Sequence, residues 1–294
     1  MGQYYQIFNL DKKQYLAPRK LGDGTKLCEF SSSSHGVMAA LTLLLSRGNG
    51  LGEADFPVCD PLIGSWAGDR VVVSGDYAPK GKFTEDTEVN LWQSIEMFED
   101  ASESILMIMA KHLEFREVFQ ESIFAPERKL SEAARNAIFG AKHQQPHEQD
   151  AVLGGANNSQ PSPRPFDLVL GGKKNQSWRI FNLDKKQKIN AEDFNNSSLM
   201  DILTSAQVTT ALAVLLSSGN GEGLGDLKSE KPIVGSWAGD RIVVCGSLSN
   251  KDNLFSSRKF KNVGKEIILA LADDSYVRES LMQTLPTKQR KLIA

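Results

Sequence analysis

Four aspartates in the first half of the chain carry the oxygen ligands that a hard cation needs. Asp23, Asp60, Asp69 and Asp76 are well separated in sequence, and three of them lie beside a glycine. Because glycine lets the backbone approach a ligand closely, converging carboxylates could bind Mg²⁺ or Ca²⁺ and assist a hydrolysis. Their spacing matches no metal-binding loop. We therefore assign no metal and interpret them first as turn residues on the surface.

A second candidate is the block Gly-Ser-Trp-Ala-Gly-Asp-Arg at residues 64–70. Trp66 could offer a stacking face, and Arg70 could anchor an anion. The alternative is a structural corner, in which Trp66 fills the core, Gly68 adopts an unusual φ, and Asp69 and Arg70 bind nearby charges or backbone. We favour the structural corner, because the same block returns later in the chain.

The segment Asn-Leu-Asp-Lys-Lys at residues 9–13 has the same two interpretations. Asn9, Asp11 and Lys12 could line a pocket beside the tryptophan block. They could equally form a hairpin turn, because Asn and Asp side chains often bond to their own backbone. The hairpin turn is the simpler interpretation.

Other familiar catalytic patterns are weak. Glycine-rich stretches at 48–52 and 219–225 follow the ends of expected helices, where the helix dipole repels phosphate. His35 could pair with Cys28 or Ser34 as a nucleophile, but no nucleophile-elbow pattern is present. We therefore name no catalytic residue and no cofactor.

The chain contains an internal repeat that must position these residues. Residues 7–14 return unchanged at 180–187, and residues 64–70 return unchanged at 235–241. Three matched blocks in one order, counting the apolar run before each glycine-rich stretch, predict a duplicated domain. In this alignment Ala206 takes the place of His35.

The elements expected in the first copy begin with strands rich in aromatic and β-branched residues. A buried helix should follow, with its N-terminus capped by the serine run at 31–34. Thr204 or Ser205 should cap the matching helix. The expected segments are strands at 4–10, 14–16, 26–30 and 70–74, the helix at 37–46, an edge strand at 90–98, a helix from Asp100 or Ser102 to His112 with a further helical segment to 122, and a helix that opens at Pro126.

This pattern predicts an α+β protein of two tandem homologous domains. Each would have a mostly antiparallel sheet, a buried helix and C-terminal helices. The two domains would pack with pseudo-two-fold symmetry. Their boundaries are a first repeat at 1–141, a flexible linker at 142–176 with a possible strand at 166–170, and a truncated second repeat at 177–294 whose last helix starts at Pro286.

Composition limits the function classes. The 294 residues carry a net charge of -2, with 40% hydrophobic and 24% charged residues, which is typical of soluble globular proteins. The charge indicates no nucleic-acid partner, and no apolar run is long enough for a membrane span. The start lacks a signal-peptide pattern. Three cysteines without close spacing are expected to be reduced thiols, so we expect a cytoplasmic protein.

Five blocks together resemble a widespread family of small uncharacterised proteins. They are Met-Gly-Gln-Tyr-Tyr at 1–5, Asn-Leu-Asp-Lys at 9–12, Leu-Gly-Asp-Gly at 21–24, Trp-Ala-Gly-Asp-Arg at 66–70 and Gly-Asp-Tyr at 75–77. The resemblance covers residues 1–122 and, less completely, 177–282. It implies a fold unit and no reaction, because that family has no established activity.

The second copy departs from the family pattern at two of these blocks. Gly-Asp-Gly is absent around 194–198, and Gly-Asp-Tyr has become Gly-Ser-Leu at 246–248. A function that needs Asp23 or Asp76 should therefore belong to the first copy.

The sequence favours a binding or protein-interaction role, with a small molecule or a protein as partner. The ligand would lie beside Asn9, Asp11 and the 66–70 corner, or in the groove between the domains. The alternative is a hydrolase, metal-assisted in one version, with one site in the first repeat that uses Asp23, Asp69, Asp76 and Arg70.

Overall fold

The structure is a computed structural model that describes residues 3–47, 60–78, 80, 91–121, 130–139, 177–196, 199–219, 226–246 and 259–294. Several predicted features lie outside these residues. They are the linker at 142–176 with its possible strand, the start of the helix at Pro126, and the glycine-rich stretches apart from Gly219.

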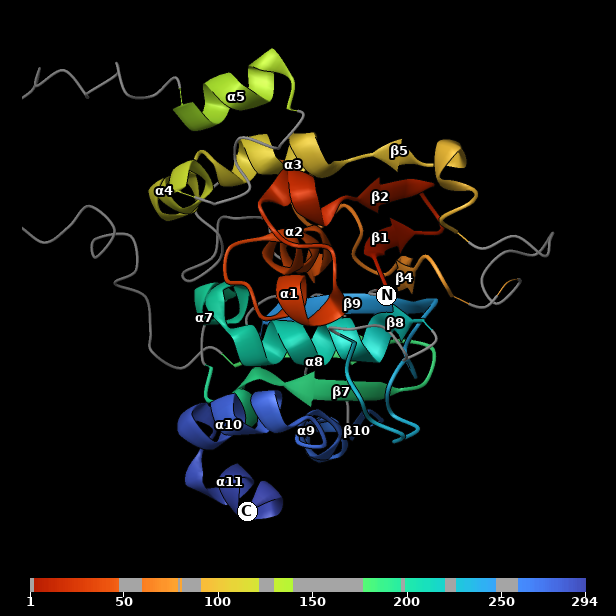
Figure 1. Cartoon of the computed structure of the whole chain (residues 1–294), viewed down its shortest axis with the longest axis vertical. Helices are drawn as coiled ribbons and strands as arrows, with labels where there is room; N and C mark the ends of the chain where they lie inside the picture. The colour runs from red at the N-terminus through yellow and green to blue at the C-terminus, as the bar shows by residue number, and fades with distance from the viewer. Residues whose placement is uncertain are drawn as a thin grey trace, which may run out of the picture.

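The chain is an α+β protein built on one mostly antiparallel sheet, which has ten strands in the described residues (Figure 1). From edge to edge the main path runs β10 (Lys261–Asn262), β7 (Gln187–Asn190), β6 (Trp178–Asn182), β9 (Asp240–Gly246), β4 (Arg70–Gly75), β1 (Tyr5–Asn9), β2 (Gln14–Leu16) and β5 (Glu99–Asp100). Two short strands, β3 (Ser46–Arg47) and β8 (Ser217–Ser218), pair in parallel with β9 and β4.

Successive side chains along each strand point to opposite faces of the sheet. In β1, Ile7 belongs to the large core beneath the helices, while Phe8 faces a smaller cluster with Val72 and Phe98 on the opposite side. The expected hairpin between β1 and β2 is confirmed, with Ile7 opposite Leu16 and Asn9 opposite Gln14.

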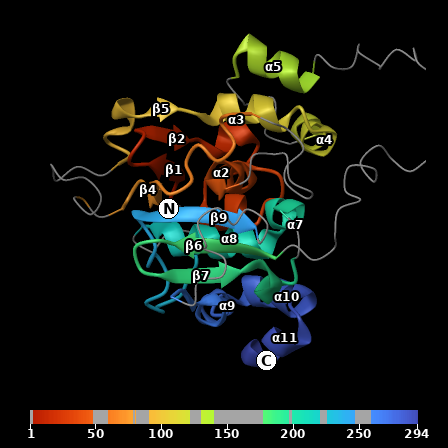
Figure 2. The ribbon, with the colours of Figure 1, turned by 180° about the vertical axis from the view of Figure 1, so that it is seen from behind.

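The helices provide the rest of the large core. Every residue of α2 is buried, which confirms the prediction from its all-round apolar sequence. The two views together show the helices gathered beside the strands, with α5 and α11 at opposite ends (Figures 1 and 2). The bounds are α1 Leu27–Ser31, α2 Val37–Leu45, α3 Ser102–Met109, α4 Leu113–Glu121, α5 Glu132–Phe139, α7 Leu199–Thr204, α8 Ala206–Leu216, α9 Gly264–Leu271, α10 Ser275–Thr284 and α11 Thr287–Ile293, with 3-10 turns η1 Pro18–Leu21, η2 Ile95–Met97 and η5 Ala191–Phe194.

The two predicted repeats share this sheet through their Val-rich strands. β4 and β9 are antiparallel neighbours, with Arg70 opposite Arg241. The short strand after each buried helix pairs with the central strand of the other half: Ser46 lies opposite Val244, and Ser217 lies opposite Val73. Helix α1 packs against α8, and α7 packs against α2. Each half therefore completes the sheet and the core of the other.

The predicted strand at 26–30 is wrong, because Leu27–Ser31 form helix α1 and Lys26 is its N-cap. The helix begins with the backbone half of a capping box, in which the Lys26 N–H donates to Glu29 Oε2 at 3.1 Å. Leu27 and Phe30 lie three residues apart on one helical face and are both buried. A segment of this length is too short for its hydrophobic period to separate a helix from a strand.

The predicted edge strand at 90–98 is also wrong within the described residues 91–98, which form turns and η2. The N–H groups of Met97 and Phe98 donate to the carbonyls three residues earlier, at 2.9 Å in both cases. The edge strand comes directly afterwards, where β5 pairs in parallel with β2. No helix among the described residues is long and apolar enough to span a membrane.

Candidate functional site

Five of the sequence candidates meet in one polar network at the end of the β1–β2 hairpin. Asn9 Oδ1 accepts hydrogen bonds from the N–H groups of Asp11 and Lys12 at 3.0 and 2.9 Å. Asn9 Nδ2 donates to Asp69 at 2.8 Å, and Lys12 pairs with the same carboxylate at 3.0 Å. The backbone N–H and Nε of Arg70 donate to the two oxygens of Asp11, both at 2.7 Å. These polar groups are therefore engaged in holding the hairpin to the start of β4.

The pKa of Asp11 reflects this role. Burial alone would raise its pKa, but the hydrogen bonds and the charge of Arg70, together with the charge of Lys12, outweigh burial and lower it. Asp11 is thus held as a carboxylate by its structural partners.

Trp66 fills the core and offers no stacking face to solvent. Its side chain is fully buried, and its Nε1 donates to Gln14 Oε1 at 2.9 Å. The bond ties the 64–70 corner to β2. The structural-corner interpretation therefore describes this tryptophan, and the interpretation of Trp66 as a stacking face for a ligand does not.

The second half contains the same set of contacts. Asn182 Nδ2 donates to Asp240 at 2.8 Å, and Lys185 pairs with Asp240. Arg241 donates through its backbone N–H and Nε to Asp184, at 2.7 and 2.8 Å. In the same way, Trp237 Nε1 donates to Gln187 at 2.6 Å. Because the same hydrogen-bonding pattern occurs in both halves, we interpret it as a requirement of the fold and not as a site specific to the first half.

The glycines of the two corners join the halves. Gly68 has a φ of +91°, and its N–H donates to the Ile242 carbonyl of β9 at 2.7 Å. Gly239 has a φ of +81°, and its N–H donates to the Val71 carbonyl of β4 at 2.9 Å. Each corner therefore hydrogen-bonds to the central strand of the other half. We call this pair of contacts the seam.

Asp23 lies away from that network and caps helix α2. Its side chain is buried, and its Oδ2 accepts a hydrogen bond from the Val37 N–H at 2.5 Å. A Cβ on Gly36 would lie 2.0 Å from that oxygen, so the glycine makes room for the carboxylate. The predicted serine cap is wrong, because no side chain of the 31–34 run caps α2.

Helix α8 is capped differently. Ser205 is its N-cap and accepts from the Val208 N–H at 3.4 Å, as the sequence predicts. Asn196 donates to the Ser205 hydroxyl at 2.8 Å. Asn196 follows a left-handed residue, Asn195, as Asp23 follows the left-handed Gly22. The loss of Gly-Asp-Gly in the second copy is therefore accompanied by a local cap.

The remaining aspartates do not converge with Asp23 or with the hairpin network. Asp76 accepts from the Tyr4 N–H at 3.1 Å at the end of β4. Asp60 accepts from the Leu62 N–H at 3.1 Å and pairs with Lys111 at 3.3 Å. Within the described ranges, no group of three or more His, Cys, Asp or Glu residues could hold a metal ion.

The histidine and cysteine candidates also lie apart. His35 Nε2 lies 2.9 Å from Glu114 Oε1, and its ring packs edge-on against Phe115 with centroids 5.0 Å apart. It lines a hollow of about 340 Å³ with Ser33, Ser34 and Asp23. Cys28 lines a different cavity. Burial, with smaller contributions from nearby carboxylates, raises the pKa of the Cys28 thiol to about 11, so the thiol is protonated at neutral pH.

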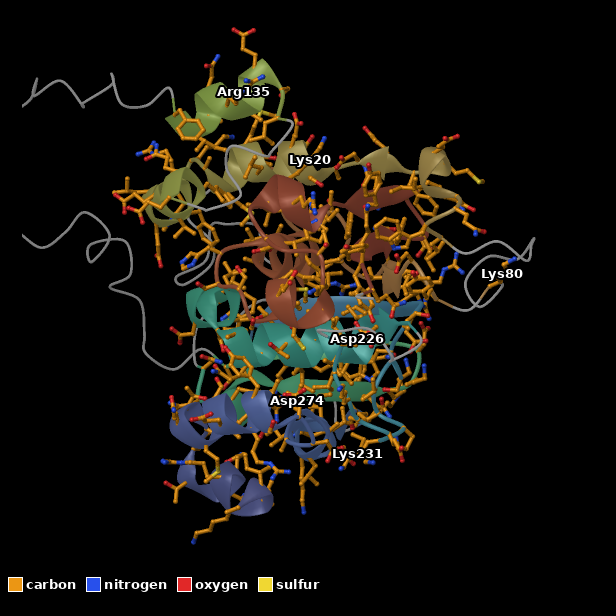
Figure 3. All side chains as sticks on the ribbon, in the orientation of Figure 1. Lys20, Lys80, Arg135, Asp226, Lys231 and Asp274 are labelled. Atoms are coloured by element: carbon orange, nitrogen blue, oxygen red, sulfur yellow. The ribbon has the colours of Figure 1, made fainter. Side chains whose placement is uncertain are left out.

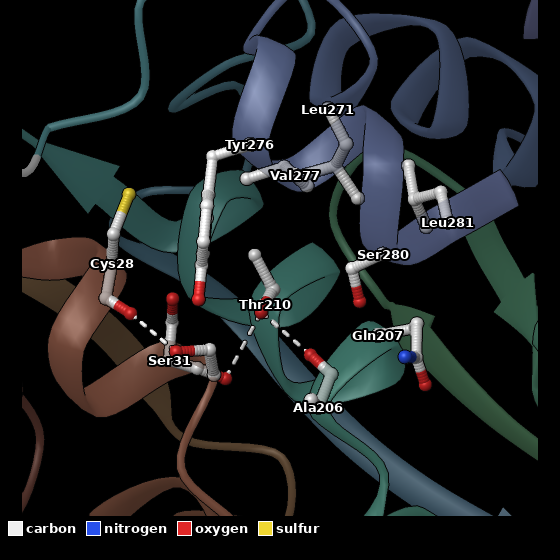
Figure 4. A pocket seen from close by; sticks show the side chains of 11 residues that line it. Cys28, Ser31, Ala206, Gln207, Thr210, Leu271, Tyr276, Val277, Ser280 and Leu281 are labelled. Atoms are coloured by element: carbon white, nitrogen blue, oxygen red, sulfur yellow. Dashed lines mark hydrogen bonds between the residues drawn. The ribbon is translucent and has the colours of Figure 1, made fainter. Parts of the chain in front are cut away.

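The cavity beside Cys28 lies at the junction of the two halves (Figure 4). Its volume is about 210 Å³, and we call it the junction cavity. Helix α1 and the residue after it line one side, and helices α8, α9 and α10 line the other. The lining residues are Cys28, Ser31, Ser32, Ala206, Gln207, Thr210, Leu271, Tyr276, Val277, Ser280 and Leu281. Both halves contribute to this concave site. The sequence predicted a possible ligand groove between the domains, but it did not predict this set of lining residues.

Comparison with known proteins finds no match. No family model, no curated protein and no solved structure is similar enough to this chain to assign a family. The arrangement of the described residues is therefore the basis for any functional conclusion.

Proposed function

We propose that the chain is a small-molecule-binding protein, made by tandem duplication, whose ligand site is the junction cavity. The observation that carries the proposal is the lining: side chains from both halves line one partly open cavity of about 210 Å³. Ligand sites are typically concave, largely apolar and supplied with a few polar groups. This volume suits a ligand smaller than a typical drug.

Equivalent pairings support the duplication and a pseudo-two-fold axis between β4 and β9. Arg70 lies opposite its own repeat equivalent, Arg241. The short strands β3 and β8 pair with the other half at positions that are equivalent in the repeat alignment, Ser46 with Val244 and Ser217 with Val73. We further propose that each half is one unit of the single-domain family that the five sequence blocks resemble.

The alignment of the copies relates the lining of the junction cavity to side-chain differences between the halves. Ala206 aligns with His35, Val277 with Phe115 and Ser280 with Val118. In the first half, the His35 ring packs edge-on against Phe115, and His35 and Val118 line a separate hollow. In the second half, smaller side chains stand at these positions and line the cavity. The junction cavity therefore differs from the corresponding hollow of the first half in its smaller side chains and in having walls from both halves.

The alternative, a hydrolase in the first repeat, has less support. Its acidic residues are used in three separate structural contacts, to Val37, to the hairpin and to Tyr4. The group of carboxylates that a metal-assisted version needs does not form in the described residues.

Refilling the cavity with first-repeat side chains tests the proposal. The double variant Ala206→His, Val277→Phe should stay folded, because the protein accommodates the same pair of rings in its first half. Compounds found by a ligand-observed NMR fragment screen of the native protein should lose binding to this variant. Met282→Ala is the matched control, because Met282 lies on α10 but does not line the cavity.

Two results would reject the proposal. One is that no fragment binds the native protein. The other is that the fragments bind the refilled variant as well as they bind the Met282→Ala control, with both variants folded by circular dichroism.

A further inference from the structure

Two hydroxyl groups that line the junction cavity, those of Ser32 and Thr210, can accept hydrogen bonds from a ligand. The Ser32 hydroxyl donates its proton to the Cys28 carbonyl at 2.6 Å. The Thr210 hydroxyl lies 3.0 Å from the Ser31 carbonyl and 2.5 Å from the Ala206 carbonyl, and it donates its proton to this pair (Figure 4). A hydroxyl that has donated its proton to the backbone has only lone pairs left. These two groups can therefore receive a hydrogen bond from a ligand.

The Ser31 hydroxyl adds a buried polar group at the same place. Ser31 is completely buried, and its Oγ has no hydrogen-bond partner among the residues that the structure describes. Its carbonyl accepts from both Thr209 and Thr210, at 2.8 and 3.0 Å. A buried polar atom without a partner costs free energy. Ser31 lines the cavity, so this cost lies in the cavity wall.

Three carboxylates lie near the Cys28 side of the cavity. Apart from burial, the groups that raise the pKa of the Cys28 thiol are three carboxylates, Asp274, Asp226 and Glu29. Asp274 is the N-cap of α10, and Asp226 is buried near Tyr5. Asp226 and Asp274 are labelled in Figure 3. The lining consists of residue types without a formal charge, and of the three carboxylates Glu29 is paired with Lys26 at 3.5 Å.

One aromatic ring and several apolar side chains complete the site. Tyr276, in the first turn of α10, is 78% exposed although it lines the cavity, so its ring is available to a ligand. An aromatic face attracts a cation. Leu271, Val277 and Leu281 offer contacts to a compact apolar body.

We propose that the junction cavity binds a small organic cation, an ammonium group on a compact apolar or aromatic body. The ammonium N–H groups would donate to the Ser32 and Thr210 oxygens, and the ring of Tyr276 and the surrounding carboxylates would stabilise the positive charge. This inference rests on the proposed function, because it assumes that the junction cavity is the ligand site.

Three probes of nearly equal size separate charge from shape: benzylammonium, benzyl alcohol and benzoate. Titrations of ¹⁵N-labelled full-length protein should show benzylammonium shifting amide signals of α1, α8 and α10. Its Kd should be at least about tenfold lower than that of benzyl alcohol, because a charged hydrogen bond is about twice as strong as a neutral one. Benzoate should not bind.

A charge variant tests the carboxylates. Asp274→Asn keeps an oxygen that can accept from the Tyr276 and Val277 N–H groups, so the helix cap remains. It should weaken benzylammonium about two- to fivefold, as expected for a partly exposed charge, and leave benzyl alcohol unchanged. Asp273→Asn is the matched control, because Asp273 is already paired with Lys231 at 2.7 Å. It should leave both affinities unchanged.

Each outcome separates the two proposals. If benzyl alcohol or benzoate binds as tightly as benzylammonium, the cation class is rejected and the site is retained. The class is also rejected if Asp274→Asn has no effect, or if no probe binds while screened fragments still occupy the cavity. If benzylammonium binds the refilled variant, Ala206→His with Val277→Phe, as tightly as the native protein, the site itself is wrong.

Discussion

Replacing Asp23 should destabilise the protein, because its carboxylate caps a buried helix. The Asp23 Oδ2 accepts from the Val37 N–H at 2.5 Å, and Val37 is fully buried. Hydrogen bonds to charged groups contribute about 1.5–3 kcal/mol, and helix N-caps about 0.5–2 kcal/mol. Both ranges describe the same bond, so Asp23→Ala should lower the free energy of unfolding by about 2 kcal/mol.

Three related variants make this test specific. Asp23→Asn keeps an acceptor and should lose less than about 1 kcal/mol. Ser205→Ala removes the weaker cap of α8, whose bond is 3.4 Å long, and should lose about 1 kcal/mol. Gly36→Ala would place a Cβ 2.0 Å from the Asp23 oxygen and displace it. Its cost should therefore be smaller in the Asp23→Ala background than in the native protein.

Guanidinium unfolding followed by circular dichroism measures these free energies from the midpoint and the slope. An Asp23→Ala protein with an unchanged midpoint would refute the cap and return Asp23 to the set of functional candidates. Equal losses in Asp23→Ala and Asp23→Asn would show that the charge, and not the acceptor geometry, stabilises the helix.

Two further predictions concern pH and the seam. Burial lowers the pKa of His112; the charge of Glu114 opposes this shift and that of His35 adds to it. The folded state therefore favours the neutral ring. Its contribution to stability is complete above the unfolded pKa of about 6.5 and is lost as the pH falls below that value. His112→Gln should therefore flatten the pH dependence of the free energy of unfolding below about pH 6.5. Denaturation series at several pH values measure it, and an unchanged pH dependence would contradict the reasoning. Gly68→Ala should cost about 1–2 kcal/mol, because Gly68 has a φ of +91° where a Cβ is strained. Gly239→Ala should cost about the same in the same unfolding assay, and a clear inequality would argue against equivalent roles for the two glycines.

Local patterns were enough to predict the parts of the fold that depend on neighbouring residues. The Asn9–Lys13 turn, the β1–β2 hairpin and the all-apolar helix α2 follow from side chains that bond or pack close by in sequence. The repeat also separated the two interpretations of Trp66 correctly. A side chain kept in both copies is more often required by the fold, and both tryptophans are buried with matching Gln partners.

Contacts between distant residues could not be predicted in this way. Asp23 caps a helix that starts 14 residues later, while a serine run stood closer and looked like the cap. The glycine beside Val37 gave a signal, because Gly36 is the residue that leaves space for the carboxylate. The junction cavity combines Cys28 with residues of α8 and α10, and neither half alone contains it.

The sequence by itself determined the repeated unit, most of its local elements and the residues that each corner must keep, because these depend on short-range hydrogen bonds and hydrophobic periodicity. The tertiary structure decided how the units join: β4 pairs with β9, and a short strand from each half pairs with the central strand of the other half. It also decided which polar side chains cap helices and where a cavity remains between the helices. Those outcomes depend on packing between segments far apart in the chain, such as helix α1 with helices α8 and α10 around the junction cavity.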